Sequence, residues 1–412
     1  MKLSSKRLLR FGKRAIRRYG GSLTHSVAVR REVSGVADIL FRPASLLRAA
    51  PGVVSCSADG QIADASLVQR LIRAYQAASL CKLDLGDSMW KAFVAQYHHH
   101  LHTLLMDGDQ AAVSDVLRNP ATNNLFYGFD ITTKDYSSAF KSDKVRKKHA
   151  LYCCDGLARF AEAVGVAGIF NPESGLRGPA ATTWDAATVL GRIRTATGWE
   201  VSVPNPFPGE HGAITPKGIV SARVSQALYQ AWRLRALSES LSSPRVLEIG
   251  AGLGRTAYYA RELGITDYTI VDIPTSLLAQ GYFLGRTLGE QGVWLHGEGR
   301  DAMQARIKLV PPTSFLDDNS TYDIIVNVDS MTELSRPMVD RYRNEIKRRC
   351  RIFLSVNHES NQFYMLEVLR ASFPDHRISR FPYWLRQGYV EEVVFISPDP
   401  GPRRPAGSAG TT

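Results

Sequence analysis

The segment Arg245–Thr256 reads R-V-L-E-I-G-A-G-L-G-R-T, an apolar stretch followed by three glycines at alternate positions. The apolar stretch predicts a strand, and the residues after the last glycine predict the start of a helix. Glycine at such a turn lets the backbone approach a ligand closely, and the N-terminus of the helix offers free N–H groups beyond it. A dinucleotide fingerprint, G-x-G-x-x-G, would place the third glycine one residue later. The spacing at Gly250, Gly252 and Gly254 therefore indicates a different cofactor, unless the turn is a tight connection without a ligand.

Two acidic residues mark the ends of the predicted strands beside this turn. Glu248 precedes Gly250 by two residues, and Asp272 directly follows the next strand, 268–271. A carboxylate at Glu248 would repel a pyrophosphate but suits the ammonium group of S-adenosyl-L-methionine (SAM). The carboxylate of Asp272 can accept hydrogen bonds from both hydroxyls of a ribose. We therefore predict a SAM site whose contacts are Glu248, Gly250, Gly252, Gly254 and Asp272.

From residue 241 onward, short apolar runs alternate with helical patterns, which is typical of βα units. The predicted strands are 245–249, 268–271, 292–295, 323–328, 351–356, 377–381 and 391–396, and the predicted helices are 255–263, 275–288, 301–308, 335–349 and 362–372. The last two strands leave no room for a helix between them, so they should form an antiparallel hairpin. We expect an α/β, Rossmann-like domain of the class I methyltransferase type, with a mostly parallel sheet and a C-terminal antiparallel hairpin.

The chain of 412 residues exceeds the usual size of one domain, so a division is expected. We predict a basic N-terminal arm over 1–50, a mainly helical substrate or cap region over 51–240, the SAM-binding domain over 241–398 and a disordered tail over 399–412. Within the second region, frequent prolines and glycines predict a loop-rich connector over 171–216.

Most of the net charge lies in the arm. Residues 1–48 contain twelve Lys or Arg and two acidic residues, so they carry +10 of the total +12. Leu8, Phe11, Ala15 and Tyr19 recur at helical spacing, which predicts a basic amphipathic helix. The alternatives for it are a solvated tail, contact with an anionic membrane surface, and binding to RNA or to a protein partner. The remaining chain is nearly neutral, which makes nucleic-acid binding by the core unfavourable.

Several classes of protein are excluded by the composition. No apolar run is long enough for a membrane helix, and the five cysteines are scattered without a C-x-x-C pair. We expect a cytoplasmic protein without a disulfide framework or a zinc site, with at most peripheral membrane contact. In the histidine run, only His98 and His102 share a helix face, and no acidic ligand lies near them, so no metal site is predicted there.

Four segments resemble a bacterial family of sugar O-methyltransferases, and the resemblance spans about residues 120–396. The segments are Val246–Ala260, Thr269–Pro274, Asn327–Leu334 and Phe353–Glu359, in that family's order and spacing. The glycine motif is generic to methyltransferases, whereas the D-S-M-x-E and N-H-E motifs are more particular to the family. The resemblance implies a Rossmann-like fold, methyl transfer from SAM, and a glycan or a nucleotide sugar as the acceptor.

The acceptor should lie beyond the fourth and fifth strands, because ligands of open α/β sheets bind at the carboxyl ends of strands. A sugar hydroxyl loses its proton during methyl transfer and so needs a general base. Histidine is the side chain type that most often serves as a general base, so His358 is the first choice, while Asp329 or Glu333 could act as the base, orient His358 or bind sugar hydroxyls. Structural roles for Asp329 and His358 are alternatives, as is a divalent metal held by Asp329, Glu333 and Glu359.

The leading hypothesis is therefore a SAM-dependent O-methyltransferase for a sugar hydroxyl. One alternative is a methyltransferase for RNA or another small molecule, with the arm as an electrostatic contact. Against RNA, the fourth strand ends in D-S-M-T-E and not in the N-P-P-Y motif typical of enzymes that methylate base amines. The other alternative is a non-catalytic SAM-binding module. Such a module would be expected to have lost residues of the SAM-binding motif.

Overall fold

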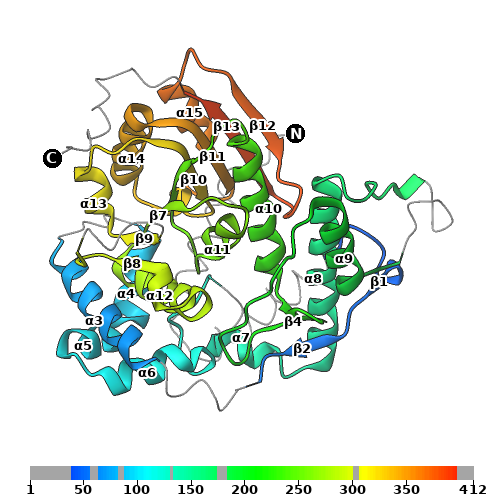
Figure 1. Ribbon diagram of the computed structural model, residues 1–412, viewed down its shortest axis with the longest axis horizontal. Helices are drawn as coiled ribbons and strands as arrows, with labels where there is room; N and C mark the ends of the chain where they lie inside the picture. The colour runs from blue at the N-terminus through cyan, green and yellow to red at the C-terminus, as the bar shows by residue number, and fades with distance from the viewer. Residues whose placement is uncertain are drawn as a thin grey trace, which may run out of the picture.

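Figure 1 shows a computed structural model of the chain. The structure describes residues 39–55, 64–81, 88–129, 133–173, 183–299 and 306–396. Most of the predicted basic arm, residues 1–38, and the predicted tail lie outside the described residues. Across the described ranges, no helix is both long and apolar enough to span a membrane.

A large mixed sheet occupies the C-terminal half of the chain. Its order is β12-β13-β11-β10-β6-β7-β9-β8, in which β6 to β11 run parallel and β13 is antiparallel to both β11 and β12. The strands are β6 (Arg245–Ile249), β7 (Asp267–Val271), β8 (Val293–Leu295), β9 (Ile307–Val310), β10 (Tyr322–Val328), β11 (Cys350–His358), β12 (Ile378–Pro382) and β13 (Tyr389–Phe395). The predicted C-terminal hairpin corresponds to β12 and β13.

Helices cover both faces of this sheet (Figure 1). Alternate residues of a strand point to opposite faces, so Val246 of β6 joins one apolar cluster and its neighbour Leu247 joins another. The first cluster contains residues of α10, α11 and α12, and the second contains residues of α13, α14 and α15. These helices are α10 (Ala222–Leu237), α11 (Arg255–Glu262), α12 (Pro274–Leu288), α13 (Pro312–Asp317), α14 (Arg336–Arg349) and α15 (Met365–Ser372).

The direction in which successive strands are added to the sheet reverses between β6 and β10. From β6 the chain proceeds outward to β7 on one side, and it later returns to lay β10 and β11 on the other side. In open α/β sheets, ligands bind at such a switch point, outside the carboxyl ends of the strands. The fold therefore places the predicted cofactor turn, which follows β6, at the position where a ligand site is expected.

The structure corrects the prediction of a helix over 301–308. Ile307–Val310 form strand β9, which pairs with β7 on one side and β8 on the other, while residues 300–305 lie outside the described part of the chain. The side chains of Ile307 and Leu309 are buried and alternate with Lys308, which is a strand pattern. The run was too short for its period of two to be distinguished from the beginning of a helix.

The predicted loop-rich connector over 171–216 also contains regular structure. Helix α9 (Ala186–Thr197) begins where the Asp185 carboxylate accepts a hydrogen bond from the Thr188 backbone N–H at 2.9 Å, and it ends at Gly198 with φ 71°. Strand β4 (His211–Thr215) follows and pairs with β2 (Pro51–Val53) and β5 (Gly218–Val220). Proline and glycine in this stretch thus delimit short elements and do not exclude them.

The helical N-terminal region shares its core with the sheet. One continuous apolar cluster includes residues of this region and the inner residues of β6, β7 and β10. The remaining elements of the region are α3 (Ala65–Leu80), α4 (Met89–Tyr97), α5 (His99–Asp107), α6 (Gln110–Arg118), α7 (Lys134–Ala139) and α8 (Asp143–Ala163), with the short strands β1 (Leu47–Arg48) and β3 (Trp184–Asp185).

Helix α3 packs closely against α12 because two glycines of α12 face it. A Cβ atom at Gly281 would lie 2.5 Å from the Leu71 side chain, and one at Gly285 would lie 2.7 Å from the Leu67 side chain, so neither position admits a larger residue without displacement of these leucine side chains. This contact holds the first helices of the described chain against the domain that carries the cofactor motif.

A buried ion network anchors the segment that precedes β1. Arg42 is 2% exposed, and its guanidinium lies 2.6 Å from the Asp155 carboxylate and 2.5 Å from the Glu162 carboxylate, both on α8. Arg159 lies 2.8 Å from the same Asp155. Arg42 was counted in the predicted basic arm, but the structure shows that it belongs to the core and is not available to a membrane surface.

We predict that Arg42→Met destabilises the fold by about 3–5 kcal/mol, because it leaves the buried Glu162 carboxylate without its cation and removes one of the two cations beside the buried Asp155. Urea denaturation monitored by circular dichroism measures the change in unfolding free energy. Arg48→Met is the matched control, since Arg48 is exposed and, among the described residues, its guanidinium hydrogen-bonds only to backbone carbonyls. A change within about 0.5 kcal/mol is expected there. Equal effects of the two variants would contradict the structural role of the network.

Candidate functional site

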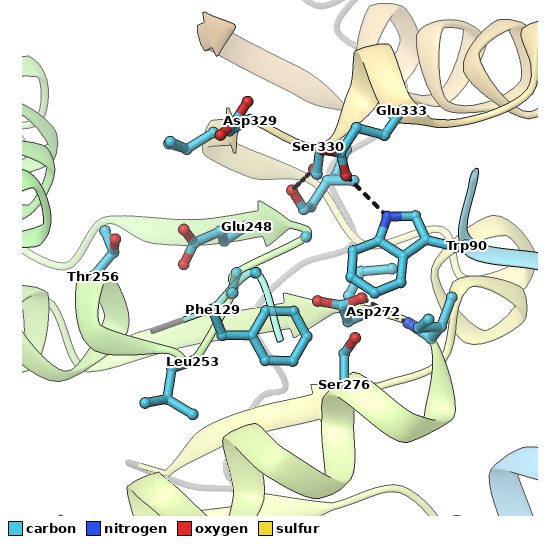
Figure 2. Close-up of a pocket in the computed structure, with 18 of the residues that line it drawn as sticks. Trp90, Phe129, Glu248, Leu253, Thr256, Asp272, Ser276, Asp329, Ser330 and Glu333 are labelled. Atoms are coloured by element: carbon cyan, nitrogen blue, oxygen red, sulfur yellow. Dashed lines mark hydrogen bonds between the residues drawn. The ribbon is translucent and has the colours of Figure 1, made fainter. Parts of the chain in front are cut away.

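A cavity of about 310 Å³ lies at the switch point of the sheet. This size is within the range of small-molecule sites. Figure 2 shows its walls, which include Glu248 from β6, Asp272 after β7, and Asp329 and Glu333 after β10. The N-terminal region supplies the opposite side, including Trp90 and Phe129. The cavity therefore joins the two parts of the chain that the sequence analysis had divided.

The three glycines of the turn have different roles. All three have positive φ, at 72°, 56° and 86° for Gly250, Gly252 and Gly254. A Cβ at Gly250 would lie 2.1 Å from the Ser330 hydroxyl, and one at Gly254 would lie 3.1 Å from Leu284. A Cβ at Gly252 meets no atom within 4 Å, and Gly252 lines the cavity. Gly250 and Gly254 thus permit close packing, whereas Gly252 leaves the cavity open.

Glu248 is held inside the protein at the end of β6. It is 1% exposed, and the hydroxyl of Tyr268 donates a hydrogen bond to its carboxylate at 2.8 Å. Burial raises the pKa of Glu248 to about 7, and the nearby charge of Asp272 adds to the increase. A cation placed beside Glu248 would stabilise its ionised form.

Asp272 is oriented by helix α12. Its carboxylate accepts hydrogen bonds from the Gln280 side chain at 2.7 Å and from the Ile273 backbone N–H at 2.8 Å. Gln280 also donates to the carbonyl of Gly252 at 3.0 Å, so one side chain fixes both the acidic residue and the glycine turn. Burial raises the pKa of Asp272 to about 6. The sequence analysis missed Gln280, which lies in an amphipathic helix without a motif.

The segments around the D-S-M-x-E and N-H-E motifs, at the ends of β10 and β11, contain side chains that hydrogen-bond to neighbouring strands. Asn327 donates to the Ile249 carbonyl of β6 at 2.9 Å, and Asn357 donates to the Asn327 side-chain oxygen at 2.9 Å. Ser330 donates to the same Ile249 carbonyl at 2.8 Å. These buried hydrogen bonds connect the three adjacent strands β6, β10 and β11. Some of the residues in and beside the D-S-M-x-E and N-H-E motifs therefore hold the structure of the site together.

Asp329 presents a carboxylate at the cavity from a strained backbone. It is the one non-glycine residue with positive φ, 55°, among the described residues. Its carboxylate accepts hydrogen bonds from the Tyr389 hydroxyl at 2.7 Å and from Arg386 at 3.1 Å. The orientation of Asp329 is therefore fixed by the loop and strand of the C-terminal hairpin.

His358 is brought to Asp329 but not to the cavity wall. Its Nε2 lies 3.5 Å from the Asp329 carboxylate, and its Nδ1 lies 2.6 Å from the Ser360 hydroxyl. His358 is not among the residues that line the cavity, whereas Asp329 and Glu333 are. The first choice of general base thus has contact with the cavity through a carboxylate and not directly.

Glu333 lies on the cavity beside Trp90, and Figure 2 marks the hydrogen bond between them. The indole N–H donates to the Glu333 carboxylate at 2.9 Å. Burial raises the pKa of Glu333 to about 8, the charge of Asp329 adds to the increase, and the bond from Trp90 opposes it. A carboxyl group with such a pKa can exchange protons near neutral pH.

The arrangement does not favour the metal alternative. Glu359 lies 2.6 Å from Arg380 and does not join Asp329 and Glu333. In the described ranges, no group of three or more His, Cys, Asp or Glu side chains could hold a metal ion. In the histidine run, His98 is buried with its pKa lowered to about 4, and His102 lies 2.9 Å from the Tyr75 hydroxyl.

Two further residues of the site had no assigned role in the sequence analysis. Arg255, at the start of α11, lines the cavity and pairs with the buried Glu210 at 2.7 Å. Trp90, on α4, covers the side of the cavity next to Asp272 and Ser276 in Figure 2. Arg255 directly follows the last glycine of the turn, so its position was a signal in the sequence, whereas Trp90 reaches the site only through tertiary packing.

Comparisons with known proteins give matches to solved structures only. No protein-family model and no curated protein matches the chain. The methyltransferase domain of bacterial CtHen1 is similar over 40% of this chain and 97% of that chain, with 12% identity and a TM-score of 0.31. The glycopeptide N-methyltransferase MtfA in complex with SAM is similar over 40% of this chain and 87% of that chain, with 14% identity and a TM-score of 0.30. At these scores the likeness carries no conclusion about what this chain binds or does.

Proposed function

We propose that this protein is a SAM-dependent methyltransferase that acts on a sugar hydroxyl. The observation that carries the proposal is the pair of carboxylates, the buried Glu248 and the half-buried Asp272, that line one cavity with the open glycine position Gly252. A pyrophosphate would be repelled by this pair, whereas a ligand with an ammonium group, a sulfonium group and a ribose would be bound by it. SAM combines these three groups and supplies an activated methyl group.

Each residue near the turn has a defined part in this proposal. Glu248 would accept hydrogen bonds from the donor's ammonium group, and Asp272 would accept them from its ribose hydroxyls. Gln280 fixes Asp272 and the glycine turn together, so that the two ends of the donor site keep their spacing. Gly252 leaves the path between them free.

Glu333 is the base that we favour for the acceptor. In the transfer, the acceptor oxygen forms a bond to the methyl carbon, the bond from that carbon to sulfur breaks, and the hydroxyl proton passes to the base. Glu333 lines the cavity and has a pKa near neutrality, while Asp329 lines it with a carboxylate already bound by Arg386 and Tyr389. His358 would act on Asp329 as a positioning residue. The sugar acceptor itself is supported by the resemblance of Asn327–Leu334 and Phe353–Glu359 to sugar O-methyltransferases.

A direct test is incubation of the full chain with methyl-labelled SAM and separate pools of nucleotide sugars, lipid-linked glycans and RNA. Label is expected in a sugar pool, at an oxygen that mass spectrometry of the product can identify. Label in RNA alone would contradict the sugar proposal while supporting the enzyme class. Donor binding without label in any pool would support the non-catalytic alternative.

We predict that Gly252→Val weakens SAM binding by about tenfold or more, a loss of at least about 1.4 kcal/mol, because the new side chain would occupy the cavity. Isothermal titration calorimetry measures this affinity. Gly264→Val is the matched control: Gly264 also has positive φ, 87°, and open space around its Cβ position, but it lies in an exposed turn outside the cavity. Undiminished affinity in Gly252→Val would overturn the cofactor assignment.

We predict that SAM affinity rises with pH between about 5.5 and 7.5. The free protein holds Asp272 and Glu248 with pKa values of about 6 and about 7, so both are protonated and neutral at the low end of this range. A cationic donor binds the ionised forms better, so it should release protons on binding. Calorimetry in buffers of different ionisation enthalpy measures both effects. The Glu248→Gln variant should bind SAM more weakly and lose most of the pH dependence of its affinity. A wild-type SAM affinity that falls as the pH rises would contradict the placement of the donor.

We predict that Glu333→Gln lowers the turnover number by about 10²–10⁴-fold, the usual contribution of a positioned base. Because the base acts when ionised, wild-type turnover should rise with pH through a midpoint near or below 8, the pKa of the free protein's Glu333, and this ionisation should be absent in the variant. His358→Ala should have a smaller effect. The reverse ranking, with His358→Ala nearly inactive and Glu333→Gln active, would return the base role to His358.

A further inference from the structure

Three aromatic rings from the N-terminal region extend the cavity wall beyond Trp90. These rings belong to Phe93 of α4, to Tyr127, which precedes α7, and to Tyr136 of α7. All three line the cavity and are half-buried. The centroids of Phe93 and Tyr127 lie 5.3 Å apart with planes inclined by 33°, and those of Tyr127 and Tyr136 lie 5.4 Å apart with planes inclined by 25°. The rings therefore present a continuous aromatic surface to the cavity, which we call the aromatic wall.

The first of these rings is not explained by core packing. Helix α4 contains no buried residue, so Phe93 fills no position in the apolar core. Large apolar side chains left half-exposed at a cavity are typical of small-molecule sites. The donor is held by residues of β6, β7 and α12, so the aromatic wall is available to the second substrate.

The charged groups at this end of the cavity do not add up to a net negative charge. The carboxylate of Asp329 is bound by Arg386, and Arg223 of α10 also lines the cavity, where its guanidinium donates to the Gly128 carbonyl beside Tyr127 at 3.1 Å. The raised pKa of Glu333 leaves this group largely protonated at neutral pH. An ammonium group would thus find little net negative charge here, so a neutral acceptor suits the site better than a cationic one.

We propose that the aromatic wall of Phe93, Tyr127 and Tyr136 is an acceptor subsite that stacks against the apolar face of an uncharged pyranose ring. This inference rests on the proposed function and names the part of the chain that selects the acceptor. The C–H groups on one face of a pyranose match the negative face of an aromatic ring, while its hydroxyls lie along the edge. Asp329 and Glu333 lie where carboxyl oxygens could accept hydrogen bonds from such an edge.

Saturation-transfer NMR on the full chain tests the subsite without requiring turnover. The probes are methyl α-D-glucopyranoside, methyl α-D-mannopyranoside and methyl α-L-rhamnopyranoside, with S-adenosylhomocysteine present so that no methyl group can be transferred. Irradiation of aromatic protons is expected to saturate the ring C–H protons of at least one probe. Phe93→Ala should weaken that binding about fivefold, the usual effect of one aromatic contact.

Two further variants separate the subsite from a general effect on α4 or α7. Tyr97→Ala is the matched control, because Tyr97 lies on the same helix, with its ring centroid 4.8 Å from that of Phe93, but does not line the cavity. The sugar affinity of this variant should equal that of the wild type. Tyr136→Phe keeps the ring and should retain binding. Calorimetry with SAM should show the same donor affinity in all three variants.

The outcomes distinguish this inference from the proposed function. Donor binding without saturation of any of the three probes, or equal losses in Phe93→Ala and Tyr97→Ala, would overturn the acceptor subsite alone. Binding of methyl 2-amino-2-deoxy-α-D-glucopyranoside in preference to its hydroxyl counterpart would overturn the assignment of an uncharged acceptor. Absence of donor binding in the wild type would overturn the proposed function itself.

Discussion

The close approach of Gly250 to Ser330 is the constraint on which the site depends. No Cβ atom fits at Gly250, because the Ser330 hydroxyl occupies that space and bonds to the carbonyl at the end of β6. Asn327 bonds to the same carbonyl, so the ends of β6 and β10 are held in one register. With this register fixed, Glu248 near the end of β6 and Asp329 directly after β10 face a common cavity. A larger residue at Gly250 would separate the strands where the carboxylates must converge.

The N-terminal region completes the cavity because it is packed onto the sheet domain at several points. Gly281 and Gly285 let α3 approach α12 of the sheet domain, and within the N-terminal region Arg42 fixes the segment before β1 to α8 through two buried carboxylates. Trp90 then reaches across to Glu333. Such a region is better regarded as one half of the site than as a separate cap, since the apolar cluster that contains its helices also contains the strands beneath the cavity.

The sequence revealed the parts of the site that are local in the chain. Glu248, Asp272 and Asp329 follow or end strands, and the short apolar runs between helical patterns made those strands recognisable. Gln280 and Trp90 could not be predicted, because each acts on a residue that tertiary packing brings to it. The helix predicted over 301–308 failed for a related reason: β9 is a strand by virtue of its pairing with β7 and β8, and its four residues carry too little periodicity to show it.

The electrostatics of the cavity fit a reaction in which two charges disappear together. The proposed sulfonium donor would bring a positive charge into a buried space, where Glu333, with its pKa raised to about 8, could ionise in response. In the proposed transfer Glu333 would take the acceptor's proton, so its negative charge would be lost at the same step that removes the positive charge from sulfur. Opposite charges attract strongly in a space of low dielectric constant, but separate burial of each is costly, so mutual neutralisation is favoured there more than in water. The burial that raises the pKa of Glu333 would thus also favour the transfer. After the transfer, the cavity would attract the uncharged thioether product less strongly than it attracts the donor.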